Sequence, residues 1–184
     1  GDVASVILPQ YELDDRSFQA IAEAVVPVVQ RAGVAALICG EHRVAVRTGA
    51  DGLHIDGPVE TVREAIEQFA PDKIVGGGRA KDRHSALELG ELRPDYVFFG
   101  KLAGDIKPEP HHKNVALGRW WASFVEIPCM VMGGRALESV VDIAESGAEF
   151  VALRDAVFAD PQKAAMMVAE ANAMLDEKAP RFEA

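Results

Sequence analysis

Residues 127–157 read IPCMVMGGRALESVVDIAESGAEFVALRDAV, and this stretch decides the fold. In chain order it predicts a strand at 128–132, then Gly133 and Gly134, a helix at 137–146 closed by Gly147, a strand at 149–153, and finally Arg154 and Asp155. Strands that are apolar along their whole length are buried on both faces, as in parallel sheets. The stretch is therefore interpreted as a βαβ unit.

The same alternation of strand and helix continues through the rest of the chain. Five more strands are predicted at 3–8, 34–39, 53–55, 73–75 and 95–99, and helical segments after Asp14 or Asp15 and at 43–47, 58–69, 85–92, 115–124 and 160–175. Regular alternation indicates a parallel sheet, which is either open or closed into a barrel.

Seven strands are one fewer than a (β/α)₈ barrel needs. The first of them begins directly after the start of the chain, so we expect a first strand and helix to precede Gly1. The predicted fold is a single TIM-barrel domain over residues 1–184, without its first βα unit. An open Rossmann-like sheet is the alternative, but no G-x-G-x-x-G motif follows the first strand.

Composition and charge exclude several classes of function. Of 184 residues, 49% are apolar, which is enough for one well-buried domain. The net charge of −10 argues against a nucleic-acid partner, and no apolar run reaches membrane-spanning length. Cys39 and Cys129 lie in apolar runs and are interpreted as reduced thiols of a cytoplasmic protein, with a metal pair as the alternative.

Two glycine-rich turns are candidate phosphate sites. In (β/α)₈ barrels the loops after the last two strands commonly hold a phosphate, which selects Gly133, Gly134, Arg154 and Asp155. Asp155 and Arg154 could instead form only an ion pair that caps the last short helix. Gly78 and Arg79 end a second such turn, whose glycines could also simply relieve crowding.

Four blocks of the sequence together resemble the thiamine-phosphate synthases and their TenI-like relatives. GADGLHI at 49–55 is similar to the family block GADGVHLGQ, and RPDYVFFG at 93–100 is similar to GADYVGFGPVF. Residues 127–134 resemble PVVAIGG, and 147–157 resemble GADGVAVISAI. The resemblance implies a (β/α)₈ barrel. It also implies a transferase that joins a hydroxymethylpyrimidine diphosphate to a thiazole phosphate, with Mg²⁺ and loss of diphosphate.

The chain departs from the family at the groups that handle diphosphate and metal. Pro9 and Tyr11 stand where the family carries an Arg and a Lys that bind diphosphate. Cys39 and Gly40 replace the Asn-Asp whose Asp binds magnesium, and the acidic residues nearby are displaced. The candidates for a weak magnesium site are Glu41, Asp56 and Glu60. Because Mg²⁺ requires oxygen ligands in tight octahedral geometry, these changes should weaken metal and diphosphate binding.

Three side chains are candidates for catalysis. Lys107 lies near a family lysine, and Lys101 stands where TenI-like tautomerases carry a His that moves a proton. A lysine is a general base only where burial disfavours its charged form, so Lys101 is interpreted as an electrostatic group. Lys107 could equally be a solvated loop residue. His54, at a strand end, could titrate or could be a hydrogen-bonded wall residue.

Other polar and aromatic clusters receive structural interpretations. His111 and His112 are adjacent and lack a third ligand in the sequence, so a solvated loop is preferred over a metal site. Trp120, Trp121 and Phe124 share one helix and are interpreted as core or interface. A homo-oligomer is compatible with either interpretation.

The sequence therefore leaves three hypotheses about function. The first is a divergent thiamine-phosphate synthase whose displaced carboxylates replace the usual metal ligands. The second is a TenI-like isomerase, or another enzyme that acts on a small phosphate ester without a metal. The third is a non-catalytic protein that binds a thiazole phosphate or thiamine phosphate.

Overall fold

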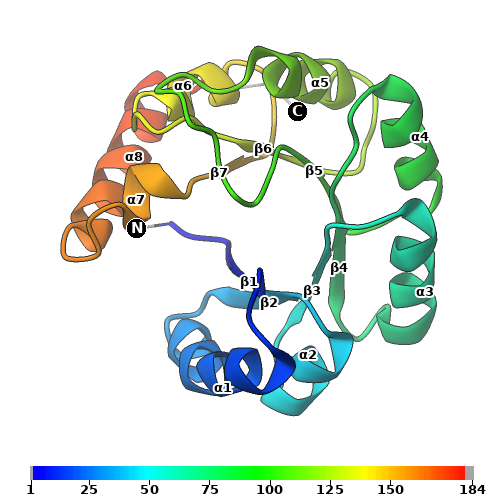
Figure 1. Ribbon diagram of the computed structural model, residues 1–184. Coiled ribbons are helices and arrows are strands. Elements are labelled where there is room, and N and C mark those ends of the chain that lie inside the picture. Colours follow the sequence, from blue (N-terminus) through cyan, green and yellow to red (C-terminus); the bar gives the residue numbers. More distant parts are fainter. Residues whose placement is uncertain (1, 181–184) are drawn as a thin grey trace. The chain divides into compact units, whose positions relative to one another are not determined.

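The computed structural model describes residues 2–180, which form two compact units. The N-terminal unit is Val3–Gly78, and the C-terminal unit is Asp2 with residues 79–180 of the described chain. Helices and strands alternate along the chain up to α7 (Asp155–Phe158), which is followed by a second helix, α8 (Ala164–Lys178; Figure 1). The expectation of a single domain stays a prediction.

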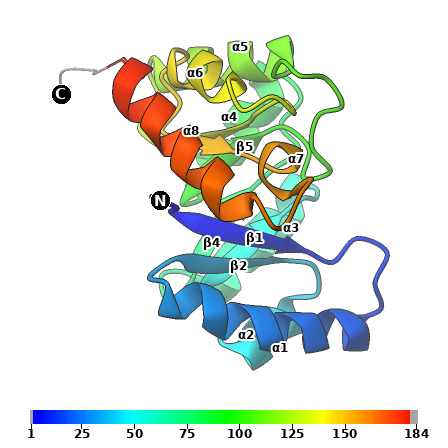
Figure 2. The ribbon, with the colours of Figure 1, turned by 90° about the vertical axis from the view of Figure 1, so that its left-hand side faces the viewer.

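The N-terminal unit contains four parallel strands and three helices. They are, in order, β1 (Ser5–Pro9), α1 (Asp15–Arg31), β2 (Ala35–Cys39), α2 (His42–Thr48), β3 (Gly52–Ile55), α3 (Val59–Phe69) and β4 (Ile74–Gly77). Neighbouring strands pair in sequence order, β1 with β2, β2 with β3 and β3 with β4. In Figure 2, α1 and α2 lie side by side along β2, with which both are in contact.

Local sequence explains where the first helix of this unit begins and ends. The Asp14 carboxylate accepts a hydrogen bond from Ser17 N at 3.0 Å, which caps the start of α1. Phe18, Ala22 and Val26 recur at helical spacing and are buried. Pro27 lies within the helix, which nevertheless continues to Arg31.

The C-terminal unit contains three parallel strands and five helices. They are α4 (Arg83–Glu91), β5 (Tyr96–Phe99), α5 (His112–Ala122), β6 (Cys129–Met132), α6 (Ser139–Ala144), β7 (Phe150–Ala152), α7 (Asp155–Phe158) and α8 (Ala164–Lys178). β6 pairs in parallel with β5 on one side and with β7 on the other. α8 contacts both α6 and α7 (Figure 2).

Trp121 is the centre of packing between the helices and strands of this unit. It is fully buried, and its indole Nε1 donates to Ile127 O at 2.7 Å. Its ring lies edge-on to Phe99, with centroids 5.9 Å apart. The sequence-based interpretation of this aromatic as a core residue is confirmed, whereas Phe124 is exposed.

The prediction of a closed (β/α)₈ barrel is wrong. The described residues form a sheet of seven parallel strands in the order β1 to β7, whereas closure with this architecture requires eight. The Rossmann-like alternative also fails, because its 3-2-1-4 strand order does not occur among β1 to β4. The alternation pattern correctly predicted a parallel sheet. The expected unit before Gly1 lies outside the described residues.

Three further boundaries differ from the sequence-based expectation. Gly76 and Gly77 belong to β4 rather than to a turn, and α5 begins at His112 instead of at residue 115. The segment expected as one terminal helix at 160–175 contains α8 from Ala164, preceded by the separate short helix α7. Between residues 2 and 180, no helix combines the length and the apolar character needed to cross a membrane.

Candidate functional site

The turn after β6 is the centre of the candidate anion site in the C-terminal unit. Gly133 and Gly134 are both buried, and each N–H donates to a fixed acceptor of the same unit. Gly133 N donates to Ala152 O of β7 at 2.8 Å, and Gly134 N donates to Ser139 Oγ at 3.0 Å. These two bonds fix the turn between the two strands and the first residue of α6.

Two arginines share one carboxylate beside this turn. Arg154 Nη1 lies 2.6 Å from Asp155 Oδ1, and Arg135 Nε lies 3.3 Å from Asp155 Oδ2. The predicted ion pair between Arg154 and Asp155 is confirmed. The predicted helix cap is not, because the Arg154 side chain makes no capping hydrogen bond to α7.

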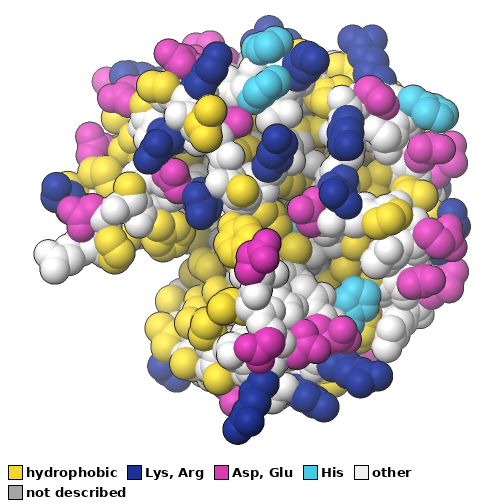
Figure 3. Space-filling view, in the orientation of Figure 1, with side chains coloured by type: hydrophobic (Ala, Val, Ile, Leu, Met, Phe, Trp, Pro, Cys, Tyr) yellow, Lys and Arg dark blue, Asp and Glu magenta, His cyan; other side chains and the backbone are white. Residues whose placement is uncertain are grey.

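Sequence reasoning missed Arg135. Only its position directly after Gly134 could have drawn attention to it, since its partner Asp155 lies twenty residues further along the chain. With two guanidinium groups and one carboxylate, the cluster carries one excess positive charge. Figure 3 shows further Lys and Arg side chains, in dark blue, on the visible face of this unit. The site is thus locally cationic in a chain of net charge −10.

The loop from residue 100 to residue 111 brings both candidate lysines to the same unit. Lys101 and Lys107 have exposed side chains, and their backbone carbonyls accept hydrogen bonds from Gly104 N and Arg135 N at 2.8 Å each. Lys107 is therefore joined to the turn after Gly134 through its backbone.

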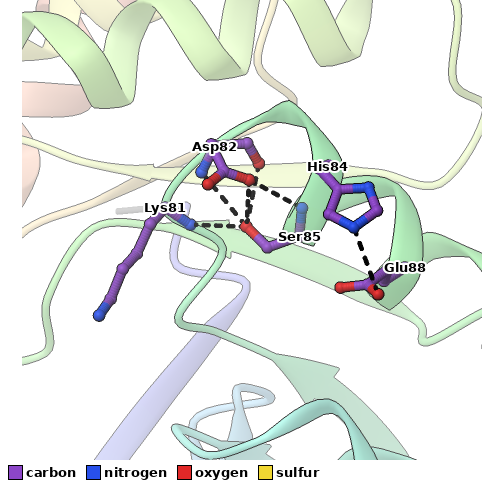
Figure 4. Close-up of polar contacts among 5 residues, drawn as sticks. All are labelled: Lys81, Asp82, His84, Ser85 and Glu88. Atoms are coloured by element: carbon purple, nitrogen blue, oxygen red, sulfur yellow. Dashed lines mark hydrogen bonds and ion pairs between the residues drawn. The ribbon is translucent and has the colours of Figure 1, made fainter.

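The other predicted phosphate turn is built differently. Gly78 N donates to Ile55 O at 2.9 Å in the N-terminal unit, and Arg79 is exposed with φ of 65°. In the C-terminal unit, Asp82 is the N-cap of α4 (Figure 4). Its carboxylate accepts a hydrogen bond from Ser85 N at 2.9 Å. These Ser85 hydrogen bonds lower the pKa of Asp82, so a carboxylate of the chain itself holds the helix terminus.

The same close-up shows a reciprocal capping arrangement. Ser85 Oγ accepts hydrogen bonds from Asp82 N at 3.2 Å and from Lys81 N at 3.1 Å. His84 Nε2 lies 3.6 Å from Oε1 of Glu88, one helical turn further along α4 (Figure 4). Local stabilisation of α4 therefore accounts for this polar cluster.

The three predicted magnesium ligands all belong to the N-terminal unit. Glu41 precedes α2, Asp56 follows β3, and Glu60 pairs with Arg63 at 3.3 Å. No group of three or more His, Cys, Asp and Glu side chains within residues 2–180 is arranged to hold a metal ion. Because Mg²⁺ is usually bound by one or two carboxylates together with substrate phosphates and waters, magnesium binding by these residues stays a prediction.

His54 and Cys129 are buried titratable groups, and Cys39 is partly buried. Burial lowers the pKa of His54 to about 4, so its imidazole is neutral at pH 7. Both thiols are free. Burial, reinforced by Asp56, raises the pKa of Cys39 to about 11, and burial together with Glu149 raises that of Cys129 to about 12. Neither thiol is therefore an activated nucleophile.

His111 and His112, for which the sequence favoured a solvated loop over a metal site, lie at the start of α5. His111 caps α5 by accepting a hydrogen bond from Lys113 N at its Nδ1, 3.3 Å away. His112 is the first residue of that helix and stacks on the neighbouring imidazole, with centroids 4.9 Å apart.

Comparisons with known proteins agree with one another. A family model described as thiamine monophosphate synthase matches residues 1–157. The thiamine-phosphate synthase of Rhodospirillum centenum is 33% identical over 178 residues, covering 95% of this chain and 85% of that protein. That of Hyphomonas neptunium is 31% identical over 187 residues, covering 97% and 83%. A solved thiamine phosphate pyrophosphorylase from Pyrococcus furiosus has a similar fold, with a TM-score of 0.68 at 18% identity and coverage of 93% and 85%. The chain belongs to the thiamine monophosphate synthase family.

Proposed function

We propose that this protein binds a small phosphorylated heterocycle of the thiazole-phosphate type and serves thiamine biosynthesis. The proposed site is the pair of turns after β6 and β7, with Gly133 and Gly134 on one side and the Arg135–Asp155–Arg154 cluster on the other. That cluster carries the proposal, because guanidinium groups bind phosphate through forked, charge-assisted hydrogen bonds. Family membership supports the choice of ligand.

The first candidate activity is that of a transferase releasing diphosphate. Such a reaction requires positive groups that stabilise the charge of the leaving group. In this chain Arg135 and Arg154 belong to the thiazole-phosphate side of the proposed reaction, and Lys107 adds an exposed cation on the neighbouring loop. Magnesium binding by Glu41, Asp56 and Glu60 stays a prediction, and the proposal assigns no step to magnesium.

The second candidate is binding without turnover. It is favoured by Pro9 and Tyr11, which stand where the resemblance to the family places two diphosphate-binding cations. An isomerase that uses Lys101 as a base receives less support, because this side chain is exposed and a lysine base needs burial. A cytoplasmic location and a homo-oligomeric state stay predictions.

Isothermal titration with a thiazole phosphate tests the site. Arg154→Ala and Arg135→Ala should each weaken binding by about tenfold or more, the loss of one charge-assisted contact. Arg119→Ala, which removes an exposed arginine of α5, is the matched control and should bind like the wild type. Equal affinities for wild type and Arg154→Ala would contradict the proposed site.

Turnover separates the two candidate activities. The wild-type protein is incubated with both phosphorylated precursors and added Mg²⁺, and thiamine phosphate is measured. Product that disappears in Arg154→Ala supports the transferase. Ligand binding without product, at micromolar protein, supports the binding protein.

A further inference from the structure

We propose that residues 104–110 form a strap that occupies the anion-binding donors of the turn after β6, and that this strap must lift before a phosphate binds there. The inference rests on the proposed function, because it concerns access to the same site. The strap is part of the segment between β5 and α5. Its backbone contacts give it a specific role.

Two carbonyl groups of the strap accept hydrogen bonds from the backbone N–H groups that follow Gly133 and Gly134. Arg135 N donates to Lys107 O at 2.8 Å, and Ala136 N donates to Pro108 O at 3.1 Å. These N–H groups follow Gly133 and Gly134 directly, so they are among the donors that a phosphate at the turn would use. Carbonyl oxygens of the chain thus stand where oxygens of a ligand would be bound.

The close approach of the strap explains the glycine at position 134. A Cβ at Gly134 would collide with Pro108 O and would lie 2.6 Å from the carbonyl carbons of Pro108 and Glu109. Because no side chain fits between the turn and the strap, the strap backbone lies directly on the glycine. The missing side chain therefore admits the strap as well as a ligand.

The strap and Asp155 also engage the arginines. Gly104, with φ of 78°, packs on the Arg154 side chain, since a Cβ there would lie 3.2 Å from Arg154 Cδ. Asp155 holds Arg154 and Arg135 through its two oxygens. Within the chain itself, two carbonyl groups and one carboxylate thus bind the N–H groups and the arginines of the proposed anion site.

The docked strap has few contacts that would oppose lifting. Ile106 is 86% exposed, and Lys107, Pro108 and Glu109 are also exposed. One side-chain bond closes its end, where Asp105 accepts from His111 N at 3.2 Å. A segment that buries little apolar surface opens locally at low free-energy cost. A phosphate that replaces the two carbonyls would accept hydrogen bonds from the same two N–H groups, those of Arg135 and Ala136, which lose their partners when the strap lifts.

Limited proteolysis with proteinase K, in the presence of increasing inorganic phosphate, tests the exchange in the wild-type protein. Most ligands protect the loops that they contact, whereas here phosphate should increase cleavage within residues 104–110. The amides of Arg135 and Ala136 should meanwhile remain protected from hydrogen exchange, because phosphate replaces the carbonyls as acceptor. Unchanged cleavage at a phosphate concentration that saturates binding would overturn the strap proposal.

Gly104→Ala provides a variant with the strap weakened and no change in charge. A Cβ at this left-handed position strains the turn and presses on Arg154, so the Arg135 and Ala136 amides should exchange faster without phosphate. Its affinity for phosphate should rise about tenfold, since apparent affinity scales with the open fraction. Gly33→Ala, at φ of 74° with nothing within 4 Å, imposes comparable backbone strain elsewhere and should leave phosphate affinity unchanged.

A second pair of variants keeps the proposal testable if Gly104→Ala does not fold. Asp105→Ala removes the acceptor of His111 N, whereas Asp105→Asn removes the charge and keeps an acceptor oxygen. Tighter phosphate binding in Asp105→Ala than in Asp105→Asn supports the strap, and equal binding contradicts it. Phosphate binding absent from the wild type and from every strap variant would instead refute the proposed function.

Discussion

His54 shows how burial changes the meaning of a residue that is prominent in the sequence. The side chain lies in β3 and is 1% exposed. Its parallel partner in β4 is Gly76, whose missing side chain leaves room beside the imidazole. A role in proton transfer stays a prediction, but the local packing agrees with the alternative of a wall residue. The most direct consequence of its burial concerns stability.

The stability of the protein should fall as the pH decreases from about 6.5 towards 4, partly because of His54. Its pKa is about 4 in the folded state, whereas an unfolded histidine titrates near about 6.5. In that window the unfolded state binds a proton that folded His54 does not, so acid favours unfolding. The full contribution is up to about 3 kcal/mol.

Urea unfolding at pH 7.0, 6.0, 5.0 and 4.5 measures this effect. His54→Gln should flatten the dependence of the unfolding free energy on pH, whatever its stability at pH 7. His84→Gln removes an exposed histidine and should retain the slope of the wild type. Parallel slopes for wild type and His54→Gln would contradict the assignment.

At the scale of elements, the pattern of apolar residues predicted the strands better than the site. Every predicted strand is present, since each is a short apolar run bounded by turn residues. The start of α5 could not be predicted, because it depends on a hydrogen bond that the His111 ring accepts from Lys113 N. The contacts of Arg135 with Asp155 and Lys107 O could not be predicted either. They depend on how β6 pairs with β7 and on a backbone carbonyl that has no side-chain signature.

Helix α4 packs closely enough on Trp121 that its glycine should tolerate no side chain. A Cβ at Gly90 would lie 2.6 Å from Trp121 Cη2, and the indole is fully buried with its N–H bonded. Gly90→Ala should therefore destabilise the protein by about 1–3 kcal/mol through overpacking, despite the better helix propensity of alanine. Gly57→Ala, whose Cβ would make only ordinary contacts at 3.6 Å or more, is the control and should change stability by less than about 1 kcal/mol.

Chemical denaturation followed by Trp fluorescence measures both variants. Because α4 is a helix with good capping at Asp82, a gain in stability for Gly90→Ala would mean that propensity outweighs packing here. Such a gain would contradict the close approach between α4 and α5.

At the scale of the whole molecule, the residues proposed for thiazole phosphate and the positions that the family resemblance connects with diphosphate belong to different units. The cationic cluster proposed to bind thiazole phosphate, Arg135 with Arg154, is in the C-terminal unit. The positions connected with diphosphate, Pro9 and Tyr11, are in the N-terminal unit. The chain as a whole carries a net charge of −10, which opposes the binding of a polyanion unless local cations offset it. We therefore expect the protein to bind thiazole phosphate more readily than diphosphate.

Restoring the two cations should change diphosphate binding alone. Pro9, the last residue of β1, is partly buried, and Tyr11 is exposed with φ of 46°. A lysine at position 11 would adopt the same backbone conformation as the tyrosine does. Pro9→Arg with Tyr11→Lys should tighten inorganic diphosphate binding by about tenfold or more, the value of one charge-assisted contact. The control Val28→Lys with Val46→Lys adds the same charge at exposed positions of α1 and α2. Calorimetry should show tighter diphosphate binding only for the first pair, with thiazole-phosphate affinity unchanged in both. An equal gain in the control would mean that net charge, rather than the position of the cations, limits diphosphate binding.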